Sequence, residues 1–77
     1  MSFFVMEFLE HFNIREELRD EVKRQVQDES EAYSKYLRMA DVAEELGEID
    51  AAATLRSIAM DEDRHRRLLE EMLRSLC

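Results

Sequence analysis

The sequence of 77 residues contains no proline, no tryptophan, one glycine and one cysteine. With glycine only at position 47, the chain has little of the turn chemistry that hairpin-rich sandwiches and barrels need, so all-β folds are excluded. The lone Cys77 excludes an internal disulfide framework, and it excludes a zinc or iron–sulfur site built from cysteines. The chain is 45% hydrophobic and 39% charged. Such a composition is typical of long helices and too apolar for a disordered segment.

Positive charge and long apolar runs are also scarce. Eleven basic residues stand against 19 acidic ones, for a net charge of −8, whereas a nucleic-acid binder needs a basic stripe against the phosphates. The longest apolar run, Phe3 to Met6, is far shorter than the roughly 20 residues that span a bilayer, and no basic segment precedes it as in a signal peptide. We therefore expect a cytoplasmic protein that binds neither nucleic acid nor membrane.

The single glycine divides the chain into two breaker-free segments. We predict helices over about 14–46 and 49–76, with Gly47 in the left-handed position that ends the first helix. Asn13 and Glu16 have the spacing of a capping box, which predicts that the first helix begins there. The apolar residues 1–12 are expected to form a short helix or arm. The prediction is an all-α antiparallel hairpin in a single domain of residues 1–77.

Both predicted helices carry an apolar stripe at three- and four-residue steps. The stripe of the first comprises Ile14, Leu18, Val22, Val26, Tyr33, Tyr36, Ala40 and Ala43, and that of the second Ala52, Leu55, Ala59, Leu69, Met72 and Leu76. A lone hairpin has little against which to bury these stripes. The simplest solution is a dimer of hairpins that forms a four-helix bundle.

Each stripe is interrupted by a residue of the wrong chemistry. Glu29 interrupts the first, and Glu62 with His65 interrupts the second. Glu29 precedes Gly47 by the same sequence distance at which His65 follows it, and Glu62 stands one helical turn nearer to the glycine. An antiparallel hairpin therefore brings all three to about the same height. A carboxylate on an apolar face is costly unless it is paired, hydrogen-bonded or bound to a metal.

Two carboxylates and one imidazole are half of a binuclear metal site. A two-fold dimer would supply four glutamates and two histidines, which is the ligand set of di-iron and di-manganese carboxylate bundles. Carboxylate oxygens suit iron, and positions left open admit dioxygen or peroxide. We therefore expect Glu29, Glu62 and His65 to bind two iron ions per dimer.

The sequence around these residues resembles the first helical hairpin of the ferritin-like superfamily, and it is most similar to rubrerythrin and bacterioferritin. The resemblance covers residues 22–73 and is carried by residues 29–40, Gly47 and residues 58–65. In that family a glutamate is followed by a tyrosine after seven residues and by Glu-x-x-His after 33, and Glu29, Tyr36, Glu62 and His65 keep these intervals. The resemblance implies that Glu29 and His65 are terminal metal ligands, that Glu62 bridges the metals, and that Tyr36 supports the site from outside the ligand shell. The implied activity is that of a ferroxidase or of an enzyme that reduces oxygen or peroxide, linked to iron storage or oxidative-stress defence.

Two departures from the family pattern shape the expected partners. Rubrerythrins and ferritins carry two ligand sets in one chain, whereas this sequence carries one, so the site requires a homodimer or a larger homo-oligomer. The cysteine pairs of rubrerythrin's electron-donating domain are absent, so a peroxidase activity would need an external electron donor. Two-helix members of the superfamily include proteins housed in encapsulin shells; the resemblance allows such a shell as a partner, but no residue of this sequence indicates one.

Two other interpretations of the same residues remain open. The polar layer of Glu29, Glu62 and His65 can instead fix the register of a non-catalytic helical association module. The site can also hold manganese or zinc rather than iron, because ligand type alone does not select among these metals.

Overall fold

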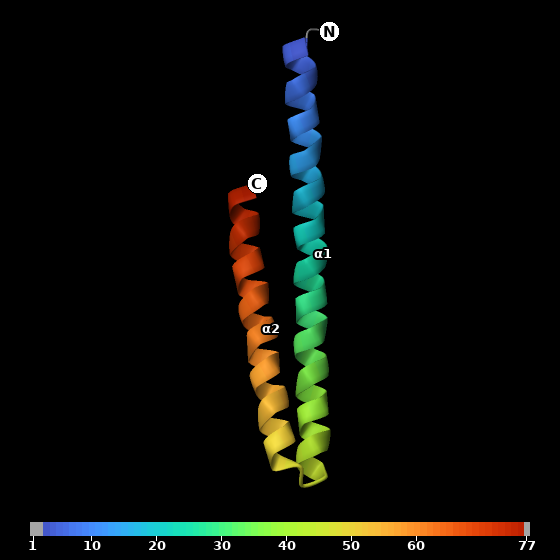
Figure 1. Cartoon of the computed structure of the whole chain (residues 1–77), viewed down its shortest axis with the longest axis vertical. Coiled ribbons are helices and arrows are strands. Elements are labelled where there is room, and N and C mark those ends of the chain that lie inside the picture. The colour runs from blue at the N-terminus through green and yellow to red at the C-terminus, as the bar shows by residue number, and fades with distance from the viewer. Residues whose placement is uncertain (1–2, 77) are drawn as a thin grey trace.

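The computed structural model describes residues 3–76, with the side chains of residues 3–8 and 12 outside the description. The helix α1 spans Phe3–Glu45 and the helix α2 spans Ile49–Leu76. They run antiparallel side by side and give a rod of 68 × 15 × 13 Å (Figure 1). The predicted all-α hairpin is confirmed. Neither helix has a stretch long and apolar enough to cross a membrane, within the described residues.

The predicted break near Asn13 is wrong. The helix α1 passes through Asn13 without interruption, and Glu16, the other half of the expected capping box, instead lies 3.3 Å from Arg19 in an ion pair along the helix. Residues 3–13 include neither proline nor glycine, so this segment contains no helix breaker. An asparagine inside a helix costs only about 0.7 kcal/mol relative to alanine. Interrupting the helix would leave several backbone groups without partners. Residues 3–12 are therefore the first turns of α1 rather than a separate element.

The turn between the helices has the form of a Schellman motif. The Gly47 amide donates to the Glu44 carbonyl oxygen at 3.0 Å, and the Glu48 amide donates to the Ala43 carbonyl oxygen at 2.9 Å. These bonds satisfy carbonyl groups at the end of α1, and they require the residue after the helix to adopt a left-handed conformation. Gly47 has φ 76°, as its position in the sequence predicts. The carbonyl oxygen of Glu48 then accepts from the Ala52 amide at 3.0 Å and opens α2.

We expect the substitution Gly47→Ala to lower the free energy of unfolding by about 1 kcal/mol, because a Cβ atom at this positive φ is strained. No atom lies within 4 Å of the position that the Cβ would take, so the cost is one of backbone conformation and not of collision. Urea unfolding at one fixed protein concentration measures it. Gly47→Asn should lose less, because asparagine tolerates this conformation better. Equal losses for both variants would contradict the explanation.

The contact between the helices is built from small side chains. Ala40 and Ala59 have no exposed surface, and Ala52 has 1%, which lets the two backbones approach closely. Val22 extends this contact toward the N-terminal half of α1. Ile14 and Leu18, which the sequence places in the same stripe, are instead 60% and 46% exposed. The helix α2 ends at Leu76, about level with Leu18, and Ile14 lies beyond that end, so α2 does not cover them (Figure 1).

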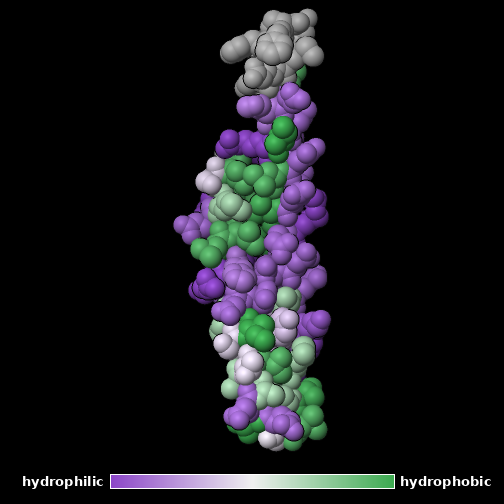
Figure 2. Space-filling model, in the orientation of Figure 1, coloured by the Kyte–Doolittle hydropathy of each residue, from purple (hydrophilic) through white to green (hydrophobic). Residues whose placement is uncertain are grey.

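Ion pairs join the two helices near the turn and also form within α2. Arg56 of α2 pairs with Asp41 and Glu44 of α1, whereas Arg66 lies 2.9 Å from both Asp63 and Glu70 of its own helix. Exposed pairs of this kind each contribute at most about 1 kcal/mol. Figure 2 shows a face of the hairpin along which two hydrophobic areas lie with a hydrophilic band between them.

Candidate metal centre

Glu29, Glu62 and His65 lie together near the middle of the hairpin. One ligand atom from each lies within 4.8 Å of the others. The helix α1 supplies Glu29, and successive turns of α2 supply the other two, because residues three apart point from the same side of a helix. The equal height that the spacing from Gly47 predicts is therefore the arrangement that the structure has.

Glu29 is well enclosed, with 13% of its side-chain surface exposed. Its Oε1 atom accepts a hydrogen bond from the Gln25 Nε2 atom at 3.1 Å. Its Oε2 atom is buried and has no hydrogen-bond partner among the residues that the structure describes. A buried carboxylate oxygen without a partner is costly, and this one is turned toward the cluster rather than toward water.

His65 faces that oxygen but does not bond to it. Its Nδ1 atom lies 3.8 Å from the Glu29 Oε2 atom, which is too long for a hydrogen bond. The His65 side chain is 44% exposed. The cluster is thus enclosed on the side of Glu29 and open toward the surface at His65.

The two carboxyl groups affect each other's protonation. The neighbouring Glu62 carboxyl, as a donor when it is protonated, lowers the pKa of the Glu29 carboxyl, and the Gln25 amide and the charge of His65 lower it further, against the opposing effect of burial. The same contact raises the pKa of Glu62, as do burial and the negative charge of Glu29. A proton on Glu62 therefore gives the Glu29 oxygen a donor. When both groups are ionised, two negative charges lie close together with no donor between them.

The donor set and its spacing fit a divalent cation. Two carboxylates and an imidazole are the ligands that iron, manganese and zinc accept in proteins. Ligand atoms bound to one such ion at about 2.0–2.2 Å lie roughly 3 to 4 Å apart, which is compatible with the observed cluster. A cation would also give the unpartnered Glu29 oxygen a positive partner.

The sequence pattern singled out Tyr36 as a residue that supports the cluster, but it did not single out Gln25. Tyr36 is partly buried on α1, two helical turns and about 10 Å along the axis from Glu29. Within the described residues no hydrogen bond joins it to the cluster, and its supporting role stays a prediction. Gln25, which does hold Glu29, was not singled out by the sequence. The signal was its position four residues before Glu29 on the same helix face.

A comparison with protein families gives a match over most of the chain. The family model described as Rubrerythrin matches residues 20–77, a span that includes all of α2 and the part of α1 that carries Glu29. No curated protein and no solved structure matches the chain.

Proposed function

The chain belongs to the rubrerythrin family, and on that premise we propose that it is a di-iron carboxylate protein whose site is completed across a homodimer. Its activity is that of a ferroxidase or of an enzyme that reduces dioxygen or peroxide, with a role in iron storage or oxidative-stress defence. The observation that carries the proposal is the buried Oε2 atom of Glu29, which has no partner and lies within reach of a second carboxylate and an imidazole.

A second copy is needed because one hairpin offers too few ligands for two ions. Glu29, Glu62 and His65 give three side chains, whereas a di-iron carboxylate bundle uses four carboxylates and two histidines. A two-fold axis beside the cluster doubles the set to this number. Larger homo-oligomers built from such dimers, including one inside a protein shell, are compatible with the same site.

Each residue has a definite task in this proposal. Gln25 holds the Glu29 carboxylate through Oε1 and leaves Oε2 free for a metal. Glu62 would supply the second carboxylate of the cluster, where a bound metal would compete with a proton because the contact with Glu29 raises the pKa of Glu62. The exposed side of His65 gives ferrous ions and small oxidants a way in. Iron bound here would supply the electrons that reduce dioxygen or peroxide, and repeated turnover with peroxide requires an external electron donor.

Anaerobic loading with ferrous iron, followed by removal of free metal, tests the proposal. Elemental analysis and native mass measurement on the same sample should give two irons per dimer. Admission of air should then produce a ferric absorption band, and consumption of peroxide with an added reductant would distinguish a peroxidase from a ferroxidase. Parallel loading with manganese and with zinc, each in competition with iron, tests the choice of metal. Protein that stays metal-free after all three loadings would contradict the proposal and favour an association module.

A further inference from the structure

Five exposed hydrophobic side chains of α1, from Ile14 to Leu46, lie on a single line along the helix. Their spacing belongs to a heptad pattern of alternating four- and three-residue steps, which keeps residues on one seam of a helix that packs against a partner. We call this line the outer seam. It comprises Ile14, Leu18, Glu21, Gln25, Asp28, Ala32, Lys35, Met39, Val42 and Leu46.

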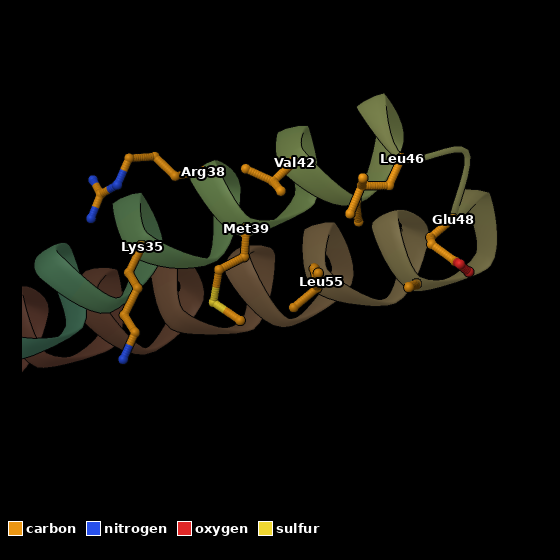
Figure 3. Close-up of a pocket in the computed structure, with 9 residues that line it drawn as sticks. Lys35, Arg38, Met39, Val42, Leu46, Glu48 and Leu55 are labelled. Atoms are coloured by element: carbon orange, nitrogen blue, oxygen red, sulfur yellow. The ribbon is translucent and has the colours of Figure 1, made fainter.

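The outer seam is distinct from the line of α1 that packs on α2. Val22 and Ala40, on the inner line, are buried, whereas Met39 and Val42 of the outer seam, at levels that α2 does reach, are 42% and 55% exposed. Near the turn, the seam borders an apolar groove of about 600 Å³. Figure 3 shows Met39 and Val42 of α1 and Leu55 of α2 around this groove.

The outer seam is symmetric about Ser30. Ile14 and Leu46 stand at equal sequence distances on either side of Ser30, and so do Leu18 and Val42. The inner members follow the same rule in the pairs Glu21 with Met39, Gln25 with Lys35 and Asp28 with Ala32. Two copies of the seam laid antiparallel about this point would therefore place apolar ends against apolar ends, with Glu21 against Met39 next to them and Gln25, Asp28, Ala32 and Lys35 in the middle.

A second line, on α2, has the same symmetry. Its members repeat at the same steps and are symmetric about the midpoint between Asp63 and Arg64; they are Ala51, Leu55, Ile58, Glu62, His65, Leu69, Met72 and Leu76. In an antiparallel pair, Glu62 falls opposite the second copy's His65. Because Glu29 lies beside His65 within one hairpin, the two centres of symmetry are at the same height. One two-fold axis, perpendicular to the rod at the cluster, satisfies both lines.

We propose that a second copy of this chain covers the outer seam in antiparallel register about Ser30, so that α1 packs on α1 and α2 on α2. This rests on the proposed function only in that the axis brings two Glu29, Glu62 and His65 clusters together. The apolar ends supply the hydrophobic surface that the dimer buries, with Ile14 against the second copy's Leu46 and Leu18 against its Val42. The first turns of α1, before about residue 10, extend past the turn of the partner.

Charge favours the antiparallel arrangement over a parallel one. In antiparallel register Lys35 lies opposite the second copy's Gln25 and between the levels of its Asp28 and Glu21. A parallel pairing of the seam would place each of these charged residues against its own copy, and like charges across a helix interface are destabilising. The occupant that fits the seam is therefore its own reversed copy.

Cysteine cross-linking tests the register. In a Cys77→Ser background, which removes the only native cysteine, we expect the double variant Leu18→Cys/Val42→Cys to form a covalent dimer on mild oxidation with diamide in EDTA. The two cysteines of one chain lie about 36 Å apart along α1, so they cannot bridge each other. The single variants Leu18→Cys and Val42→Cys are the matched controls and should form no covalent dimer, because neither position meets its own copy in this register.

The outcomes separate the register from the function. A covalent dimer of the single Val42→Cys variant overturns the antiparallel register in favour of a parallel one, and no cross-linking in any variant overturns the interface. Iron loading of the wild type is measured independently. Cross-linking in the expected register with no metal bound by the wild type would support the interface and reject the di-iron function. Iron loading of the wild type without this cross-link would reject the interface and leave the di-iron function standing.

Discussion

The double variant Glu29→Ala/Glu62→Ala is expected to bind no iron, while its apoprotein unfolds at the temperature of the wild type or above it. Loading is lost because the variant removes the two carboxylates of the cluster and leaves only His65 of the three donors. The apoprotein keeps or gains thermal stability because the double change removes a buried oxygen without a partner and the repulsion between two neighbouring carboxylates. Replacing costly buried polar groups with apolar ones is often neutral or stabilising.

The matched control is Glu31→Ala/Asp61→Ala, which removes the same charge from the same two helices. Glu31 accepts a hydrogen bond from Gln27 at 3.0 Å and Asp61 lies 4.0 Å from Arg64, so both belong to exposed local pairs outside the cluster. This control should load iron as the wild type does. Elemental analysis after anaerobic ferrous loading and a thermal melt of each apoprotein in EDTA give both readouts. Full iron content in the first variant would show that the cluster is not the ligand set.

The sequence indicated the cluster because Glu29, Glu62 and His65 are conspicuous where they stand. Each interrupts an apolar stripe, and their distances from Gly47 fix their heights once an antiparallel hairpin is assumed. Both the hairpin and the left-handed glycine were predictable, because a chain with one glycine and no proline offers only one place to turn. What each side chain does once there was not predictable. The unpartnered Oε2 atom of Glu29 follows from side-chain placement, which periodicity does not contain.

The outer seam shows where sequence periodicity reaches its limit. Two heptad lines one residue apart run along α1, and their apolar members overlap when read as one stripe. Ile14 and Leu18 were grouped with Val22 because a stripe about 100° wide includes both lines. Only the position of α2 separates the buried line of Val22 and Ala40 from the exposed line. The extension of α1 past Asn13 has a similar cause, because a good local cap is outweighed by the continuous helix around it.

The substitution Val42→Glu is expected to convert the dimer to monomer and to abolish iron loading although Glu29, Glu62 and His65 are untouched. Val42 is 55% exposed in the hairpin, so the single chain should tolerate the change and keep its helical content. In the proposed interface the new carboxylate faces the second copy's Leu18, and its burial without a partner costs several kcal/mol. The two-fold axis doubles that cost, so the dimer dissociation constant should rise by more than about a hundredfold, at about 1.4 kcal/mol per tenfold.

The control for this variant is Leu68→Glu, because Leu68 is 54% exposed and lies on neither symmetric line. Sedimentation velocity of the apoprotein across a concentration series, circular dichroism and iron content after loading should be measured for both variants and the wild type. We expect Leu68→Glu to match the wild type in all three. If Val42→Glu stays dimeric and binds two irons, the outer seam is not the surface that completes the site. If it becomes monomeric and still binds one iron per chain, which is the ratio expected of the wild-type dimer, one hairpin suffices, and the need for a second copy is wrong.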